Sequence, residues 1–370
     1  MATAGGKTID PHAISRRRFG LWMGCAGLAG AAGPALAQAP APQPRRPYLG
    51  DMHSHIAMFR QNPRTVDLRQ HLEQTGTTLL AWSLVDDTPW TRKTATGMEQ
   101  MSEPGPGEIW DYFRKRVARY DSHLKHWGLT KALTPADIDA TMAGKPHVLM
   151  AAESANFLEG RPERVAQAHA MGLRHLQLVH FIETPLGDRQ TSPPKHGGMA
   201  PVALQVINEC KRVGVVVDLA HCSPDFVNAA MAASDAAMVW SHSWVRGAAG
   251  TWRDWTYIAR ALSQEQARRF AARGGVIGLW TARVKSDRNY KVRDAETYAG
   301  EIARMVDMLG PQAVAFGTDM DGVGNDPTLA QYNDLREVAD RLAQLNWPDA
   351  VLHDVCIGNY ARVLKKAMTT

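Results

Sequence analysis

The chain has 370 residues, of which 45% are hydrophobic and 21% charged, so it has the composition of a globular protein rather than of a disordered chain. Its length is sufficient for one large hydrophobic core. The net charge is +5, but lysine and arginine are spread along the sequence. A nucleic-acid partner is therefore not expected, because such a partner calls for clustered basic residues.

The N-terminal 37 residues have the three parts of a twin-arginine export signal. Residues 15–19 (SRRRF) precede a short apolar run rich in small residues, which ends in an A-x-A cleavage pattern at residues 35–37. We therefore expect removal of residues 1–37, the twin-arginine translocation machinery as a partner, and a periplasmic protein. A lipid anchor at Cys25 is the alternative, disfavoured because residues 22–24 (WMG) do not fit the small residues that usually precede a lipidated cysteine.

A proline-rich linker is expected over residues 38–47, followed by one domain over residues 48–370. This domain contains eight apolar runs, most of them near-continuous, as in parallel strands buried on both faces. The runs cover residues 48–53, 78–85, 147–153, 174–180, 214–221, 237–242, 275–280 and 313–319. Helical patterns such as 201–212 and 295–309 separate them. Eight strand-helix units predict a (β/α)8 TIM barrel, with a doubly wound sheet as the alternative.

The interval between the second and third runs, residues 85–147, is longer than one strand-helix unit needs. It contains PGPG at residues 104–107 and a helical pattern over residues 108–127. We interpret it as an insertion over the barrel mouth that could serve as a substrate lid.

Six residues of metal-binding type stand at or just beyond the carboxyl ends of these runs. They are His53, His55, Glu153, His221, His242 and Asp319. In a barrel the carboxyl ends of the strands meet at one mouth, where catalytic groups collect, whereas an open sheet would spread them along a line. A lone histidine at a strand end is more often structural, so the prediction rests on the set.

The residue types suit a cation site with zinc as the expected metal. His53 and His55 are two residues apart, hence on the same side of an extended chain. Glu153 follows an apolar strand, where an ionised carboxylate is costly unless it is paired or metal-bound, and its two oxygens can bridge two cations. Such a pair of cations can activate a water, and Asp319 is the candidate for moving protons.

Seven segments, in this order, resemble the renal or membrane dipeptidase family, which comprises zinc metallopeptidases of the amidohydrolase-like barrel class. Residues 51–55 (DMHSH) are similar to the family's D-G-H-N-D, and Glu153 is similar to its strand-end glutamate. Residues 179–185 (VHFIETP) are similar to its T-H followed by N-T-P, and residues 214–223 (GVVVDLAHCS) to its G-V-x-x-D-L-S/A-H-x-S. Residues 240–243 (WSHS) are similar to its F-S-H-S, residues 317–322 (GTDMDG) to its G-x-D-F-D-G, and residues 358–363 (GNYARV) to its G-N-x-x-R-V. The resemblance covers roughly the whole mature chain.

The resemblance implies a zinc-dependent dipeptidase with two zinc ions and a bridging hydroxide, acting on small peptides that include those with a C-terminal D-residue. His53 and His55 would bind one zinc ion and His221 and His242 the other, with Glu153 bridging the two. His180 would contact and polarise the scissile carbonyl, Asp319 would act as general acid and base, and Arg253 would hold the substrate carboxylate. A homodimer is left open beside a monomer.

One departure from the family separates this chain from its relatives. Where the family usually has H-x-D, the sequence has His53-Ser54-His55, which replaces an anionic ligand by a neutral one and makes the site one charge more positive. The alternatives to a dipeptidase are a barrel amidohydrolase that acts on N-acyl amino acids, other amides or lactones, and a non-catalytic binding protein.

Overall fold

The structure is a computed structural model that describes residues 46–60, 62–95, 97–254, 256–285, 287–324 and 327–369. The predicted export signal, Cys25 and most of the predicted linker lie outside these residues. Within the described part of the chain, no helix has the length and apolar character needed to cross a bilayer.

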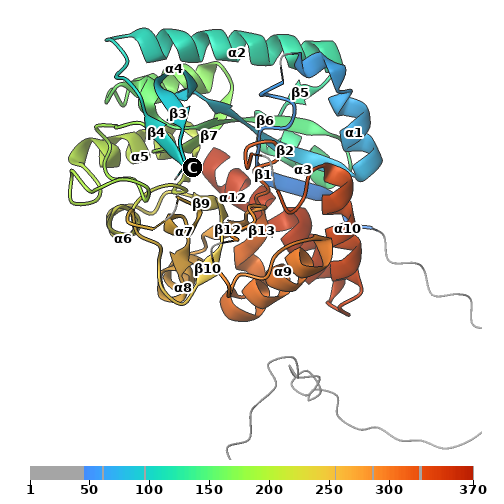
Figure 1. Ribbon diagram of the computed structural model, residues 1–370. Coiled ribbons are helices and arrows are strands. Elements are labelled where there is room, and N and C mark those ends of the chain that lie inside the picture. Colours follow the sequence, from blue (N-terminus) through green and yellow to red (C-terminus); the bar gives the residue numbers. More distant parts are fainter. Residues whose placement is uncertain are drawn as a thin grey trace, which may run out of the picture. The chain divides into compact units, whose positions relative to one another are not determined.

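Eight parallel strands form the closed barrel that the sequence predicts (Figure 1). They are β1 (Leu49–Ser54), β2 (Thr77–Val85), β6 (His147–Glu153), β7 (Leu173–Gln177), β8 (Val216–Asp218), β9 (Met238–Ser243), β12 (Val276–Leu279) and β13 (Val314–Phe316). The order is β2-β1-β13-β12-β9-β8-β7-β6, and seven pairs from Leu79↔His147 to Val85↔Glu153 close the ring between β2 and β6. All eight strands coincide with predicted apolar runs, and the barrel fold is confirmed.

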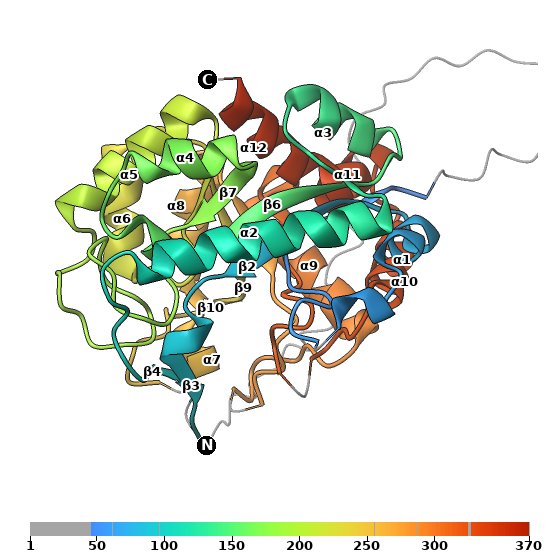
Figure 2. The same cartoon turned by 90° about the horizontal axis from the view of Figure 1, so that it is seen from above.

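Helices surround the barrel, and additional short strands lie outside it (Figures 1 and 2). The helices are α1 (Leu68–Thr75), α2 (Glu108–Trp127), α3 (Pro135–Met142), α4 (Arg164–Ala170), α5 (Pro201–Val213), α6 (Pro224–Ala233), α7 (Thr256–Ala259), α8 (Gln264–Ala272), α9 (Ala295–Leu309), α10 (Tyr332–Ala343), α11 (Asp349–His353) and α12 (Asn359–Met368), with a π-helical turn over Asp354–Gly358. The short strands are β3 (Thr91–Lys93) with β4 (Met98–Gln100), β10 (Val245–Arg246) with β11 (Leu262–Ser263), and β5 (Thr130–Lys131), which pairs with β6.

Local sequence sets where these helices begin and end. Pro201 occupies the first turn of α5, where a missing N–H costs nothing, and Gly214 ends that helix in the left-handed conformation with φ 85°. Asp294 and Thr297 form a reciprocal capping box at the start of α9. These signals explain why helix boundaries predicted from sequence lie within one residue of those observed.

The interval after β2 divides into two parts with different positions. The antiparallel hairpin of β3 and β4 contributes Thr91, Lys93 and Met98 to the wall of the cavity at the barrel mouth. Helix α2 instead covers the outside of the barrel, where the Tyr120 ring lies 4.7 Å from that of Trp82 on β2. Only the hairpin therefore lies where a lid over the mouth was expected, because the apolar face of α2 is buried against the barrel wall.

Helix α12 seals the end of the barrel opposite the mouth. Its Tyr360, Ala361 and Leu364 form one buried cluster with inward-facing strand residues such as Leu149 on β6 and Val239 on β9. Figure 2 shows α12 and the β3–β4 hairpin at opposite sides of the fold. The cavity that reaches the polar residues lies at the mouth, opposite the end that α12 covers.

Candidate active site and metal centre

The six predicted residues at strand ends, His53, His55, Glu153, His221, His242 and Asp319, converge at the mouth and are buried. His53, Glu153 and His242 lie in the last residues of β1, β6 and β9, whereas His221 and Asp319 lie three residues beyond β8 and β13. The last two have left-handed backbones, with φ 66° and 55°, which costs a non-glycine residue roughly 1 kcal/mol or more. The backbone bond from Asp319 N–H to the His53 carbonyl, 2.9 Å long, helps to hold this turn.

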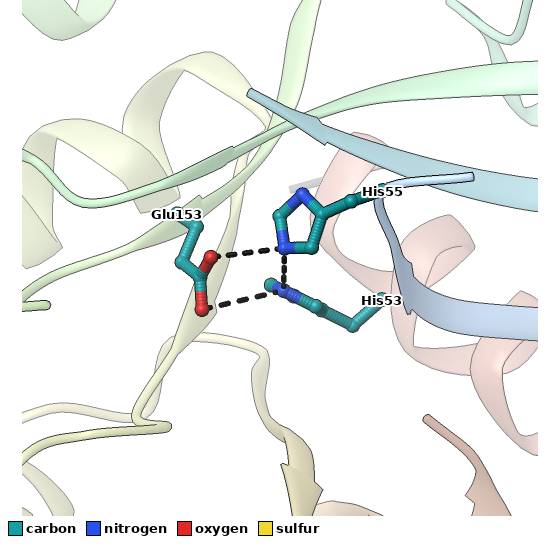
Figure 3. A group of neighbouring side chains, drawn as sticks. All are labelled: His53, His55 and Glu153. Atoms are coloured by element: carbon teal, nitrogen blue, oxygen red, sulfur yellow. Dashed lines mark hydrogen bonds and ion pairs between the residues drawn. The ribbon is translucent and has the colours of Figure 1, made fainter. Parts of the chain in front are cut away.

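The first group of ligand-type atoms comes from β1 and β6 (Figure 3). The Nε2 atom of His55 lies 3.0 Å from Glu153 Oε2, and that of His53 lies 3.4 Å from Glu153 Oε1. The two Nε2 atoms are 3.1 Å apart. Three protein ligands, here two imidazoles and one carboxylate, match a catalytic zinc site in which a further coordination position stays open for water or substrate.

The second group uses the same carboxylate. The Nε2 atoms of His221 and His242 lie 3.2 and 3.4 Å from Glu153 Oε1 and 3.3 Å from each other. Glu153 thus lies between two histidine pairs, as expected of a carboxylate that bridges two cations.

Hydrogen bonds at the other imidazole nitrogens tune these residues for metal binding. His55 Nδ1 donates to the Ser83 carbonyl over 2.8 Å, so Nε2, which faces Glu153, is the nitrogen that would bind a cation after losing its proton. Ser241 Oγ lies 2.8 Å from His242 Nδ1. The donor set therefore fits two transition-metal cations, and the ligand roles stay predictions.

His55 and the pair His221 and His242 differ in their pKa values in the metal-free protein. Burial lowers the pKa of His221 well below its usual value and that of His242 to about 4, and Arg260 adds to both effects. Burial also disfavours the charged form of His55, but the carboxylates of Glu153 and Asp319 outweigh it and raise its pKa to about 10. In the metal-free protein at neutral pH, His221 and His242 are therefore neutral, whereas His55 is protonated.

Asp319 is held as a carboxylate beside both pairs. Burial would raise its pKa, but the hydrogen bond with His55 and the nearby imidazoles lower the pKa below its ordinary value. Its Oδ2 accepts a 2.9 Å hydrogen bond from the Trp280 indole, whereas Oδ1 lies 3.3 Å from His55 Nε2 and has no other polar partner within hydrogen-bonding distance. A Cβ on Gly322 would collide with Oδ1, so glycine is required there. Oδ1 is thus available for proton transfer.

His180 is oriented by a carboxylate that no sequence motif had singled out. Its Nδ1 lies 2.9 Å from Asp87, a buried residue just beyond β2, and its Nε2 lies 3.4 Å from Glu153 Oε1. Burial would lower the pKa of His180, but the charges of Asp87 and Glu153 raise it above its usual value. The Phe181 amide also donates to Asp87, which fixes the carboxylate in place.

A cavity of about 230 Å³ opens onto these groups and contains one buried guanidinium, that of Arg260. This side chain is 2% exposed, donates to the His242 carbonyl over 3.1 Å, and lies 4.9 Å from the Trp280 ring centroid. Arg253, which was expected to hold a substrate carboxylate, does not line the cavity; it is exposed and lies 4.4 Å from the ring of Trp252. The structure thus places Arg260, not Arg253, at the cavity, and the predicted role of Arg253 in binding a substrate carboxylate stays a prediction.

The three described cysteines lie away from these roles. Cys210, Cys222 and Cys356 are buried free thiols, and burial raises the pKa of each. Buried thiols with raised pKa values are typical of packed cysteines rather than of metal ligands.

The barrel and its mouth of imidazoles and carboxylates define a protein of the metallohydrolase class. The family model described as membrane dipeptidase, peptidase family M19, matches residues 110–370, and the chain belongs to this family. The membership confirms the resemblance drawn from the motifs.

The individual curated relatives are distant in sequence. The chain is 25% identical to dipeptidase verJ of Clonostachys rogersoniana over 58% of its length, and 20% identical to human dipeptidase 3 over 59%. It spans about half the length of these curated relatives, 52% and 44%.

Two solved structures share the fold. A dipeptidase of family M19 superposes with a TM-score of 0.73 at 16% identity, covering 88% of this chain and all of that one. A Rhodobacter sphaeroides metallopeptidase liganded with a phosphinate mimic of L-Ala-D-Ala gives 0.71 at 16% identity, covering 87% and 99%.

Proposed function

We propose that the protein is a dipeptidase-type hydrolase that cleaves the amide bond of a small substrate ending in a free carboxylate, with two zinc ions held around Glu153. One observation carries the proposal: four imidazole Nε2 atoms surround a single carboxylate at the mouth of a barrel whose cavity also holds Asp319 and Arg260. Zinc bound there would activate a water for attack and polarise the amide carbonyl.

The side chains around this centre have separate tasks in the proposal. Arg260 binds the substrate carboxylate, a geometry for which a planar guanidinium is suited. His180, oriented by Asp87, donates from Nε2 to the carbonyl oxygen as charge develops on it. Asp319 accepts a proton from the nucleophilic water and passes it to the leaving amine, since its Oδ1 is free of other partners.

Two further features belong to the proposal. The ligand of the Rhodobacter sphaeroides structure mimics a dipeptide with a C-terminal D-residue, which supports acceptance of such substrates here. Residues 1–37 support export through the twin-arginine route to the periplasm.

Metal analysis and turnover test the function together. The purified protein should contain about two zinc equivalents and hydrolyse an amide next to a free carboxylate. Asp319→Asn should keep the metal and lower kcat by at least about 100-fold, because general acid and base catalysis contributes that much or more. A protein that binds no zinc, or that binds zinc without cleaving any such amide, would refute the proposal.

A further inference from the structure

The charges in the cavity bear on which amides can be substrates. Among its described lining residues the carboxylates are Asp87, Glu153 and Asp319, and the side-chain cations are Arg260 and Lys93. Two divalent cations at the centre would outweigh the three carboxylates and leave the cavity net positive. The free ammonium of an ordinary dipeptide would enter this environment against electrostatic repulsion.

Each of the three carboxylates already has a task. Asp87 accepts from His180 and from the Phe181 amide, and Glu153 faces the histidine pairs. Asp319 accepts from Trp280 through Oδ2, and its Oδ1 is needed for proton transfer in the proposed function. An ammonium that paired with Oδ1 would compete with this step.

Position 55 carries no carboxylate in this chain. The family usually has aspartate there, and here His55 lines the cavity with Nε2 directed at Glu153. As a metal ligand the imidazole is neutral, so it offers no negative charge to a substrate amine. The replacement thus removes a carboxylate from the wall beside the first cation position.

The walls near His55 are apolar. The Phe59 ring centroid lies 5.1 Å from that of His55, and Val85, Met98 and Val323 line the same cavity. Arg260 lies beside the second histidine pair, since it donates to the His242 carbonyl. A substrate carboxylate at Arg260 would therefore place the acyl part of the substrate near apolar surface and a neutral imidazole.

We propose that the preferred substrates are N-acylated amino acids with an uncharged apolar acyl group, rather than dipeptides with a free α-ammonium. This inference rests on the proposed function and specifies its substrate class. The reaction is hydrolysis: water adds its hydroxyl to the acyl carbon, the C–N bond breaks, and the leaving nitrogen takes a proton to give the free amino acid.

A matched substrate pair tests the inference with the zinc-loaded enzyme. Phe-D-Ala and 3-phenylpropanoyl-D-Ala differ only in the α-amino group, and the L-Ala pair serves as a second series. We expect kcat/KM to be at least about tenfold higher for the desamino compound at pH 7, as one uncompensated charge can impose. The ratio should fall towards unity as pH rises through about 8, where the dipeptide loses its ammonium charge, and effects of pH on the enzyme cancel in the ratio.

A variant and a binding measurement complete the test. His55→Asp should shift the ratio at least about tenfold towards the dipeptide, and zinc analysis of the variant checks that the centre is intact. Calorimetry on the zinc-loaded wild type should show tighter binding of 3-phenylpropanoate than of phenylalanine.

The outcomes separate the two proposals. Equal or faster cleavage of Phe-D-Ala with a ratio independent of pH would overturn the substrate assignment and leave the hydrolase function standing. Cleavage of no member of either series by zinc-loaded enzyme would overturn both.

Discussion

The hydrogen bond from Trp280 to Asp319 gives a quantitative test of the proposed proton shuttle. The indole Nε1 lies 2.9 Å from Oδ2 of a buried carboxylate. A hydrogen bond to a charged group contributes about 1.5–3 kcal/mol, and one pKa unit corresponds to about 1.4 kcal/mol. Because this bond stabilises the ionised form, Trp280→Phe should raise the pKa of Asp319 by about 1–2 units.

The assay is the dependence of kcat/KM on pH, from about pH 3 to about pH 9 so that the acidic limb of the wild type is covered, with zinc content measured for each protein. If Asp319 must be ionised to accept a proton, the acidic limb of the Trp280→Phe profile should move to higher pH by about 1–2 units. Trp240→Phe is the matched control, because Trp240 is equally buried and its Nε1 has no hydrogen-bond partner. An acidic limb in the same place for Trp280→Phe and wild type, at equal zinc content, would refute the role of Asp319.

Three further predictions address other parts of the site. Asp87→Asn should lower kcat about 100-fold with little change in KM, since it removes the charge that orients His180. The measurement is steady-state kinetics of variant and wild type at equal zinc content, and an unchanged kcat would contradict the prediction. Arg260→Ala should raise KM by about 30-fold or more, because the substrate carboxylate loses its buried charged partner. Arg253→Ala should change KM by no more than about twofold. The reverse pattern would restore the expectation from sequence. His55 has a pKa of about 10 in the metal-free protein, so below that pH zinc must displace a proton from it. In calorimetry of the metal-free protein, the zinc affinity of the weaker site should therefore rise about tenfold per pH unit between about pH 6.5 and about pH 8.5. A zinc affinity independent of pH would contradict this.

The sequence by itself determined the barrel and the convergence of its polar residues. Apolar runs and helix signals are local properties, which is why the strand that ends at Glu153 and the helix that follows Pro201 were predictable. Parallel strands of a barrel share one mouth, so the positions of His53 and His242 at strand ends sufficed to bring them together.

Only the tertiary structure decided which loop residues join them. Arg253 and Arg260 lie seven residues apart in one connection, and what turns Arg260 inward is its contacts with the His242 carbonyl and Trp280, which come from other strands. The pairing of Asp87 with His180 likewise joins segments 93 residues apart. Such contacts depend on packing between distant segments, for which residue type and spacing carry no local signal.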